Sequence, residues 1–186
     1  MNGIIIAGGK ATRLNGMSKG LIKVNGIPII ENQKKLLEKY CQQIIIVSND
    51  SSYDYLRNDN TVIISDLIKD IGPIGGLLSG LSFTTEEKNI VLACDMPYIS
   101  DELIQDLIDY KDNADVVVPK LLENVHTLCG IYSKNVLPII KQQIEIMDYK
   151  LKHLLNRANT FYIEYSEDMK ILFTNINTFD EFHKLN

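Results

Sequence analysis

Continuous apolar runs recur along the first two thirds of the chain and predict strands that are buried on both faces. Runs of this length without polar alternation are typical of a parallel sheet that helices cover on both sides. Helical spacing of apolar residues lies between them, at 28–40 and from an N-cap at Ser100 to about Tyr110. The expected strands are Ile4–Ala7, Ile44–Val47, Thr61–Ile64, Asn89–Cys94 and Ala114–Val118, the last one stopped by Pro119.

Strands and helices therefore alternate, which predicts an α/β fold with a doubly wound, mostly parallel sheet and helices on both faces. The glycine-rich stretch Asp70–Gly80 suggests a loop that enters a closely packed helix. Gly20–Gly26 reads as a short extended piece that closes on an Asn-Gly turn. A short helix or turn is expected around Tyr53–Leu56.

The last third of the chain contains both strand-like apolar runs and helical spacing, and we expect it to complete the same sheet. No repeat, low-complexity segment or linker interrupts the sequence, so residues 1–186 are expected to form a single domain. A capping box at Thr178 and Glu181 would begin the last helix. The expected elements are strands at Thr127–Tyr132, Thr160–Tyr165 and Ile171–Thr174 and helices at Asn135–Ile146, Tyr149–Asn156 and Thr178–Leu185.

Net charge and cysteine content limit the class of protein. The 186 residues carry a formal net charge of −5, which argues against a general nucleic-acid binder, since these need a basic face. Cys41, Cys94 and Cys129 form no C-x-x-C pair, and we expect buried thiols in a reducing cytosol. No leader or membrane-spanning run is apparent, so the prediction is a soluble, cytoplasmic protein.

The stretch Gly3–Leu21 combines a buried strand, two glycines and three cations. Gly8 and Gly9 let the backbone approach a ligand closely, and Lys10, Arg13 and Lys19 follow them. Such a loop can cradle a polyphosphate. It contains neither G-x-x-x-x-G-K-[ST] nor a G-x-G-x-x-G that opens a helix, so neither a P-loop ATPase nor an ordinary dinucleotide site is supported. The same pattern also occurs by chance in many α/β proteins.

Polar residues follow several of the predicted strands. Asn49, Asp66 and Asp95 stand at carboxyl ends, as does the glycine loop. Ligands of such sheets bind beyond these ends, so we expect these residues to converge on one rim. Asp95 could hold Mg²⁺ bound to phosphate oxygens, or cap the next turn. Asp66 could accept hydrogen bonds from guanine N1–H and its amino group, bind a ribose hydroxyl, or cap a turn.

The remaining candidates favour catalysis by positioning and charge neutralisation. Lys19 and Arg13 could neutralise a triphosphate, the first as a point charge and the second as a bidentate fork, or be solvated surface cations. His126 is isolated, and a structural or exposed role suits it better than a catalytic one. No serine–histidine–acid or cysteine–histidine pairing is readable, so the residue set suits nucleotidyl transfer without a covalent intermediate.

Four motifs together resemble the molybdenum cofactor guanylyltransferase (MobA) family, within the nucleotidyltransferase superfamily. They span almost the whole chain in the family's order and spacing. The first alone marks the wider superfamily of sugar and pterin nucleotidyltransferases. The motifs are A-G-G-x(3)-R-L/M-x(4)-K at Ala7–Lys19, the G-P-x-x-G-L-like Gly72–Leu77, C-D-x-P at Cys94–Pro97 and N-x-N-T at Asn175–Thr178.

The resemblance implies a Rossmann-like nucleotidyltransferase that joins GMP from GTP to the terminal phosphate of molybdopterin bearing molybdenum. Pyrophosphate would leave, and Mg²⁺ on Asp95 would offset charge. Residues about 1–120 would bind the nucleotide and about 121–186 the acceptor, with Asn175, Asn177 and Lys150–Arg157 toward the pterin. Partners could include molybdoenzyme clients or cofactor-insertion proteins. The implied nucleotide contacts are Ile6, Ala7, Gly8, Gly9, Lys19, Asn49, Asp66 and Asp95.

This chain departs from the family pattern at several positions. Ser18 stands where the family often has aspartate, and Asn15 where it often has glycine. A nucleotide-contacting asparagine of the family aligns with Val47, and Asn49 is near enough to substitute. The pterin-side turn usually carries arginine but reads Asp148-Tyr149-Lys150 here. Three alternatives therefore stay open: a sibling enzyme using CTP, one acting on a sugar phosphate, and a non-catalytic nucleotide or cofactor carrier.

Overall fold

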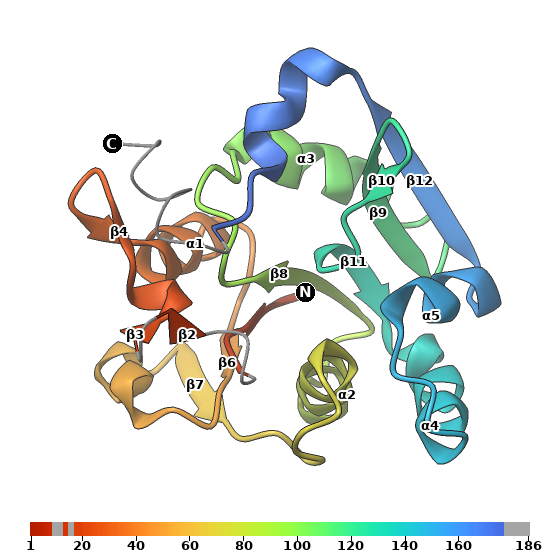
Figure 1. Cartoon of the computed structure of the whole chain (residues 1–186), viewed down its shortest axis with the longest axis horizontal. Helices are drawn as coiled ribbons and strands as arrows, with labels where there is room; N and C mark the ends of the chain where they lie inside the picture. The colour runs from red at the N-terminus through yellow and green to blue at the C-terminus, as the bar shows by residue number, and fades with distance from the viewer. Residues whose placement is uncertain (9–12, 15–16, 177–186) are drawn as a thin grey trace.

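The computed structural model describes residues 1–8, 13–14 and 17–176, with only the backbone at 13, 14 and 17. A sheet of eight strands runs through these residues in the order β10-β9-β11-β8-β1-β6-β7, and β12 pairs with β9 (Figure 1). Its strands are β1 (Asn2–Ile6), β6 (Ile44–Val47), β7 (Thr61–Ile64), β8 (Lys88–Ala93), β9 (Val116–Leu121), β10 (Asn124–Val125), β11 (Cys129–Ser133) and β12 (Thr160–Tyr165).

The sheet is mostly parallel, as predicted. β1 pairs in parallel with β6 on one side and β8 on the other, and β6 pairs in parallel with β7. β12 is parallel to β9. The strand expected at Thr127–Tyr132 is β11, and it lies antiparallel between β8 and β9. β10 folds back on β9 as a short antiparallel strand.

The described part of the chain contains five α-helices: α1 (Ile29–Leu37), α2 (Pro73–Phe83), α3 (Asp101–Asp109), α4 (Leu137–Glu145) and α5 (Leu151–Arg157). None of them is long and apolar enough to cross a membrane. The smaller elements are the 3₁₀ helices η2 (Lys19–Leu21), η3 (Ser51–Leu56), η4 (Lys134–Val136) and η5 (Glu167–Phe173) and the strand pairs β2 (Arg13–Leu14) with β3 (Met17–Ser18) and β4 (Lys23–Val24) with β5 (Ile27–Pro28).

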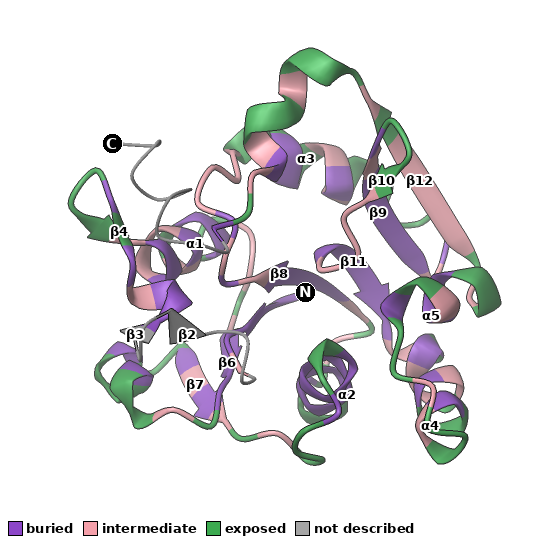
Figure 2. Ribbon diagram, viewed as in Figure 1, coloured by how far each residue is buried: buried purple, intermediate pink, exposed green. Residues whose placement is uncertain are grey.

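The helices cover both faces of the sheet, which explains the continuous apolar strands. Ile5 of β1 packs in one cluster with Leu37 of α1 and Ile104 of α3. Its neighbour Ile4 packs in a second cluster with Leu77 of α2, together with α4 and α5. Successive side chains of a strand point to opposite faces. The central strands are therefore buried along their whole length (Figure 2).

Several local predictions are confirmed. Ser100 caps α3 by accepting a hydrogen bond from the Leu103 N–H at 3.3 Å. Asn25 and Gly26 both have positive φ, 53° and 81°, at the turn between β4 and β5. Two such residues are what a tight hairpin turn requires, and Asn-Gly supplies them with little strain. The glycine-rich stretch does enter a packed helix, α2, whose N-cap Gly72 has φ 74°.

Two local predictions are wrong and one lies outside the described residues. β9 does not stop at Pro119 but continues to Leu121, because β12 pairs with it in parallel as far as Leu121 and β10 pairs with Lys120 and Leu121. Pro119 itself lies between the β11 pairing, which ends at Val117, and the β10 pairing. Ile171–Thr174 is not a strand, and its first three residues end η5. So short an apolar run does not distinguish strand from helix. The helix expected at Thr178–Leu185 lies outside the described residues.

Candidate active site

The carboxyl ends of β1 and β8 form the centre of the candidate site. The chain runs from β1 outward to β6 and β7 and then returns to β8 on the other side of β1, so the strand order reverses between β1 and β8. Open α/β sheets bind ligands beyond such a reversal. The Cys94 N–H donates to the Ile6 carbonyl at 3.1 Å. Ala7-Gly8 and Cys94-Asp95 therefore leave the sheet side by side.

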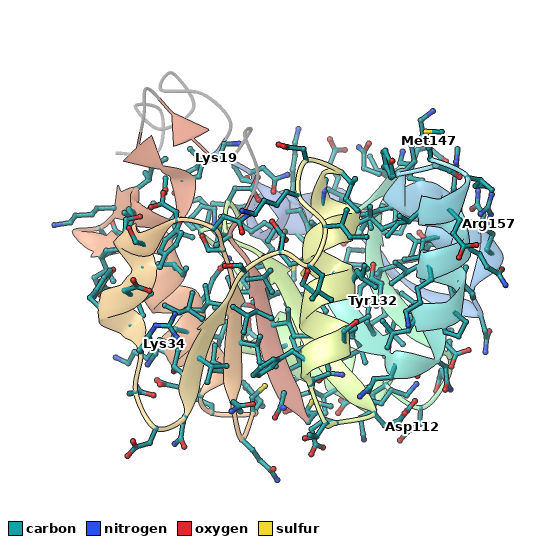
Figure 3. All side chains as sticks on the ribbon, turned by 90° about the horizontal axis from the view of Figure 1, so that it is seen from below. Lys19, Lys34, Asp112, Tyr132, Met147 and Arg157 are labelled. Atoms are coloured by element: carbon teal, nitrogen blue, oxygen red, sulfur yellow. The ribbon has the colours of Figure 1, made fainter. Side chains whose placement is uncertain are left out.

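Lys19 and Asp95 meet at this rim. Lys19 Nζ lies 3.8 Å from Asp95 Oδ2, and their side chains are 8% and 22% exposed. Figure 3 shows Lys19 at the end of the molecule opposite Asp112, which lies between α3 and β9. Burial raises the pKa of the Asp95 carboxyl, and the Lys19 charge opposes that rise. A desolvated carboxylate beside a buried cation at a ligand-binding rim is typical of a functional site.

The loop that carries Asp95 is held by hydrogen bonds to its backbone. Gln33 Nε2 of α1 donates to the Ala93 carbonyl at 2.8 Å and to the Met96 carbonyl at 3.0 Å. The Ile176 N–H donates to the Asp95 carbonyl at 2.9 Å. The sequence pattern placed Gln33 on the apolar face of its helix and gave it no role. The available signal was a single amide among positions that are otherwise apolar.

Asp66 and Asn49 form a second polar group at the same rim. Asn49 Nδ2 donates to Asp66 Oδ2 at 2.7 Å, and the Asp66 N–H donates to Asn49 Oδ1 at 3.1 Å. Burial raises the pKa of the Asp66 carboxyl, while the Asn49 hydrogen bond and the Lys69 charge lower it. Val47 is fully buried in β6, so the asparagine that reaches this rim is Asn49.

Glycines bring the Asp66 group close to β1. A Cβ atom on Gly8 would lie 3.2 Å from Asp66 Oδ2, and one on Gly76 would lie 2.8 Å from Cγ2 of Ile6. The Leu67 N–H donates to Ser79 Oγ at 2.8 Å, which ties the segment after Asp66 to α2. Gly8, the Asp66 carboxylate after β7 and the start of α2 therefore lie close together, as the predicted convergence required.

Ser18, which departs from the family pattern, is buried and hydrogen-bonded to a carboxylate. Its hydroxyl donates to Asp50 Oδ2. Asp50 Oδ1 in turn accepts the Ser52 N–H at 2.9 Å and caps η3. The carboxylate of Asp50 therefore lies beside Ser18, the residue before Lys19. This contact links β3 to the segment that follows β6. Neither sequence spacing nor residue type could reveal this contact.

Some predicted site residues cannot be placed. Gly9, Lys10, Asn15 and Asn177 lie outside the described residues, and Arg13 is described only by its backbone in β2. Asn175 is exposed and precedes Ile176, whose N–H binds the Asp95 carbonyl. The C-terminal segment therefore reaches the rim, although this contact does not test whether Asn175 binds a ligand.

His126 packs against an aromatic ring, and Cys94 is a buried thiol. The His126 ring stacks on Phe173 with centroids 4.4 Å apart, and burial lowers its pKa. A histidine with a lowered pKa is neutral at physiological pH, and the ring here packs against an aromatic side chain. Burial raises the pKa of the Cys94 thiol to about 12, so it stays protonated. The stacking of His126 agrees with the structural role that the sequence favoured for it.

The carboxylates present suit a cation shared with a substrate rather than a structural metal. Within the described ranges, no three histidine, cysteine, aspartate or glutamate side chains are grouped as metal ligands. Mg²⁺ is commonly held by one or two carboxylates together with substrate phosphates and waters. Asp95, partly exposed beside the cationic Lys19, meets that description.

Comparisons with known proteins agree with this geometry. The family model described as a MobA-like NTP transferase domain matches residues 3–161. A Flavobacterium johnsoniae protein named probable molybdenum cofactor guanylyltransferase is 37% identical over 183 residues, covering 98% of this chain and 94% of that protein. The molybdenum cofactor guanylyltransferase of Vibrio parahaemolyticus is 32% identical over 180 residues, covering 96% of this chain and 91% of that protein.

Solved structures share the fold. The molybdopterin-guanine dinucleotide biosynthesis protein A from Archaeoglobus fulgidus superposes with a TM-score of 0.80 at 24% identity, covering 100% of this chain and 96% of that chain. The 4-diphosphocytidyl-2C-methyl-D-erythritol synthase from Anaerococcus prevotii gives a TM-score of 0.73 at 14% identity, covering 100% and 93%. At these identities the likeness concerns the fold alone.

Proposed function

Since the chain belongs to the MobA-like NTP transferase family, we propose that it transfers GMP from GTP to the terminal phosphate of molybdenum-bearing molybdopterin. Pyrophosphate is the second product. The observation that carries this proposal is the Lys19–Asp95 pair, 3.8 Å apart at the strand reversal between β1 and β8. A cation and a carboxylate side by side at the ligand-binding rim support a site that binds a triphosphate together with its metal.

The chain's residues act on the triphosphate by position and charge. The loop after β1 and the Lys19 ammonium hold the phosphates, and Arg13 adds a second positive charge. Asp95 would hold Mg²⁺, which supplies neutralisation of phosphate charge when bound. An oxygen of the acceptor phosphate attacks the α-phosphorus in line, its new P–O bond forms, and the bond to the β-phosphate oxygen breaks. Charge leaves with pyrophosphate, which Lys19 stabilises.

Asp66 selects the base in this proposal. Its carboxylate accepts hydrogen bonds from guanine N1–H and the exocyclic amino group, while Asn49 orients it through the 2.7 Å bond. Cytosine presents an acceptor nitrogen between its carbonyl and amino groups, which would repel a carboxylate. Ile6, Ala7 and Gly8 line the nucleotide side, because the end of β1 lies against the Asp66 group.

The acceptor lies on the C-terminal side of the rim. The Ile176–Asp95 hydrogen bond supports this, because it joins the residue that follows Asn175 to the backbone carbonyl of Asp95. Asn175 and Asn177 are the acceptor-binding residues in this proposal. The segment Lys150–Arg157 supplies basic residues toward the pterin. Asp148 accepts hydrogen bonds from His153 Nδ1 at 2.9 Å and from Arg157 Nη2 at 3.4 Å, so this turn already pairs part of its positive charge.

Calorimetric titration with GTP, CTP, ATP and UTP in the presence of Mg²⁺ tests the choice of base. We expect GTP to bind most tightly, since Asp66 matches guanine alone among the four. Tighter binding of CTP would overturn the guanylyl assignment and favour a cytidylyl sibling. GTP binding without pyrophosphate release, when molybdopterin is supplied, would instead favour a cytoplasmic nucleotide or cofactor carrier serving molybdoenzymes or insertion proteins.

A further inference from the structure

Gln33 is a polar side chain on a helix face that otherwise packs in the core. It is 3% exposed, and its neighbours on the buried face of α1 are Ile29, Ile30, Leu36 and Leu37. An apolar side chain of similar size would fill the same space without an amide to desolvate. The presence of the amide is therefore explained by what it binds rather than by packing.

Both hydrogen bonds from this amide go to the loop that carries Asp95. Nε2 reaches the carbonyl of Ala93, two residues before Asp95, at 2.8 Å and that of Met96, one residue after it, at 3.0 Å. One rigid amide thus spans the bend at which β8 ends. Holding carbonyls on both sides of a residue restricts the backbone at that residue, and hence the direction of its side chain.

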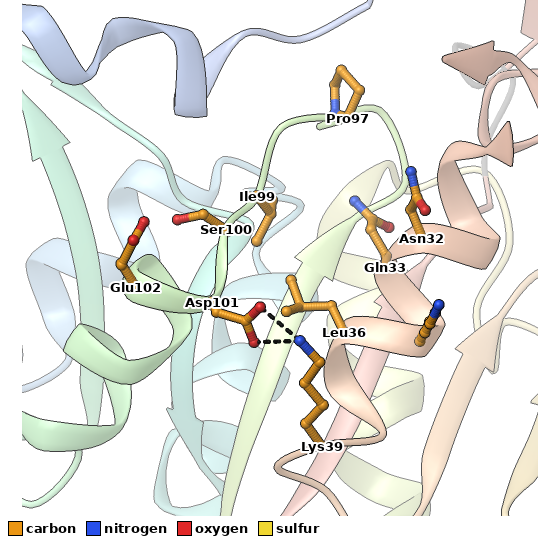
Figure 4. A pocket seen from close by; sticks show the side chains of 10 residues that line it. Asn32, Gln33, Leu36, Lys39, Pro97, Ile99, Ser100, Asp101 and Glu102 are labelled. Atoms are coloured by element: carbon orange, nitrogen blue, oxygen red, sulfur yellow. Dashed lines mark hydrogen bonds and ion pairs between the residues drawn. The ribbon is translucent and has the colours of Figure 1, made fainter. Parts of the chain in front are cut away.

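The outer side of this loop borders a pocket rather than packed core. A pocket of about 390 Å³ lies between α1 and the start of α3, lined in part by Gln33, Leu36, Pro97 and Ile99. Figure 4 shows Gln33 pointing from α1 toward the loop that bears Pro97. Because side-chain packing is incomplete on that side of the loop, the position of the loop depends more on the two Gln33 hydrogen bonds than it would in a fully packed core.

We propose that Gln33 is a positioning residue that sets the Asp95 carboxylate for the metal–nucleotide complex. The proposal rests on the metal role assigned to Asp95 above. Hydrogen-bond partners that orient a metal-binding group affect affinity for the metal even though they do not touch it. Gln33 acts one step further back, through the backbone, so it should affect the metal more than the nucleotide.

The test is Mn²⁺ binding to the full chain in the presence of a non-hydrolysable GTP analogue, followed by electron paramagnetic resonance. Gln33→Met removes the donor and keeps the volume. We expect the dissociation constant for Mn²⁺ to rise about tenfold, which is the smaller end of the effect seen when a residue that orients a metal ligand is removed. Binding of the analogue without metal should be unchanged. Gln33→Glu keeps one donor when its carboxyl is neutral. Its dissociation constant for Mn²⁺ should therefore lie between that of Gln33→Met and that of the unmodified protein.

Gln143→Met is the matched control. Gln143 is also fully buried, and its Nε2 donates to a backbone carbonyl, that of Lys150, at 2.9 Å. This variant loses a comparable hydrogen bond on α4, whose partner lies outside the loop that carries Asp95. It should lower the thermal midpoint as Gln33→Met does while leaving Mn²⁺ affinity unchanged. Equal Mn²⁺ affinity in Gln33→Met, Gln33→Glu and the unmodified protein would overturn the proposal.

Asp95→Asn separates this proposal from the proposed function. If it abolishes Mn²⁺ binding while Gln33→Met does not weaken it, the metal role of Asp95 stands and only the positioning role fails. If Asp95→Asn binds Mn²⁺ as well as the unmodified protein does, the metal assignment itself fails.

Discussion

At the scale of single residues, the site depends on carboxylates that the fold partly removes from water. Burial raises the pKa of both Asp66 and Asp95. A protein gains no stability from desolvating a carboxylate, so two such groups at one rim support the proposal that a ligand uses them. In each case a neighbour opposes the shift, Asn49 for Asp66 and Lys19 for Asp95.

Guanosine affinity should fall with decreasing pH because of Asp66. Only the ionised carboxylate accepts both hydrogen bonds from guanine, and its raised pKa brings protonation at a higher pH than the ordinary value of 3.8. A bond to a charged group is worth about 1.5–3 kcal/mol, so losing one lowers affinity about tenfold or more. Fluorescence titration with guanosine and no metal avoids any contribution from Asp95.

Asp66→Asn is the control for that titration. It should bind guanosine weakly at every pH, because the amide has a single acceptor atom and turns an NH₂ donor toward the donor edge of the base. If the variant shows the same pH dependence as the unmodified protein, another group controls affinity and the base-binding role of Asp66 is wrong.

The sequence predicted the site residues whose position follows from a strand end. Asp66, Asp95 and Asn49 were placed on one rim because each follows a strand of a parallel sheet. Gln33 and the Ser18–Asp50 bond were missed, because they join segments distant in sequence through side-chain contacts. No periodicity or spacing marks such partners before the fold is known.

At the scale of elements, α2 reaches the central strand through its glycines. A Cβ atom added to Gly80 would lie 2.5 Å from Cγ2 of Ile4, and one added to Gly76 would lie 2.8 Å from Cγ2 of Ile6. Real Cβ contacts are longer, so the helix would have to move away from β1. Because Gly76 also faces Asp66, the same close packing brings α2 to the nucleotide rim.

Gly80→Ala should therefore destabilise the protein despite its better helix propensity. Alanine gains about 1 kcal/mol over glycine in a helix, whereas overpacking a core costs about 1–3 kcal/mol. We expect a net loss of about 1 kcal/mol in the free energy of unfolding, measured by urea denaturation. Ser82→Ala, at an exposed position of the same helix, should be neutral or slightly stabilising. Equal or greater stability of Gly80→Ala would contradict this account of the packing.

Elements were predictable where burial on both faces left an unbroken apolar run, as in β1, β6 and β8. The direction of a strand was not predictable, because an apolar run does not indicate which strand it pairs with or in which direction. β11 is antiparallel in a parallel sheet, and only the structure shows it. The effect of Pro119 likewise depends on context, since β9 continues past it by pairing with β12 and β10.

At the scale of the whole molecule, segments from both ends of the chain meet at one rim. The loop after β1 brings Lys19, β8 brings Asp95, and the segment after η5 returns to bind the Asp95 carbonyl through Ile176. Ile176 also packs with Ile22 and Ile29 beside the β4–β5 hairpin. The C-terminal part of the chain is thus joined to the predicted nucleotide half at the residue proposed to hold the metal.

Pyrophosphate release tests the central claim most directly. The assay supplies Mg²⁺ and each of GTP, CTP, ATP and UTP, with and without molybdopterin bearing molybdenum. We predict release only with GTP and acceptor together. Asp95→Asn should slow it about 10²–10³-fold, whereas Asp101→Asn, which loses only exposed contacts with Lys39 and the Tyr40 hydroxyl, should not. Faster release with CTP, no release with GTP and acceptor, or full activity of Asp95→Asn would contradict the account.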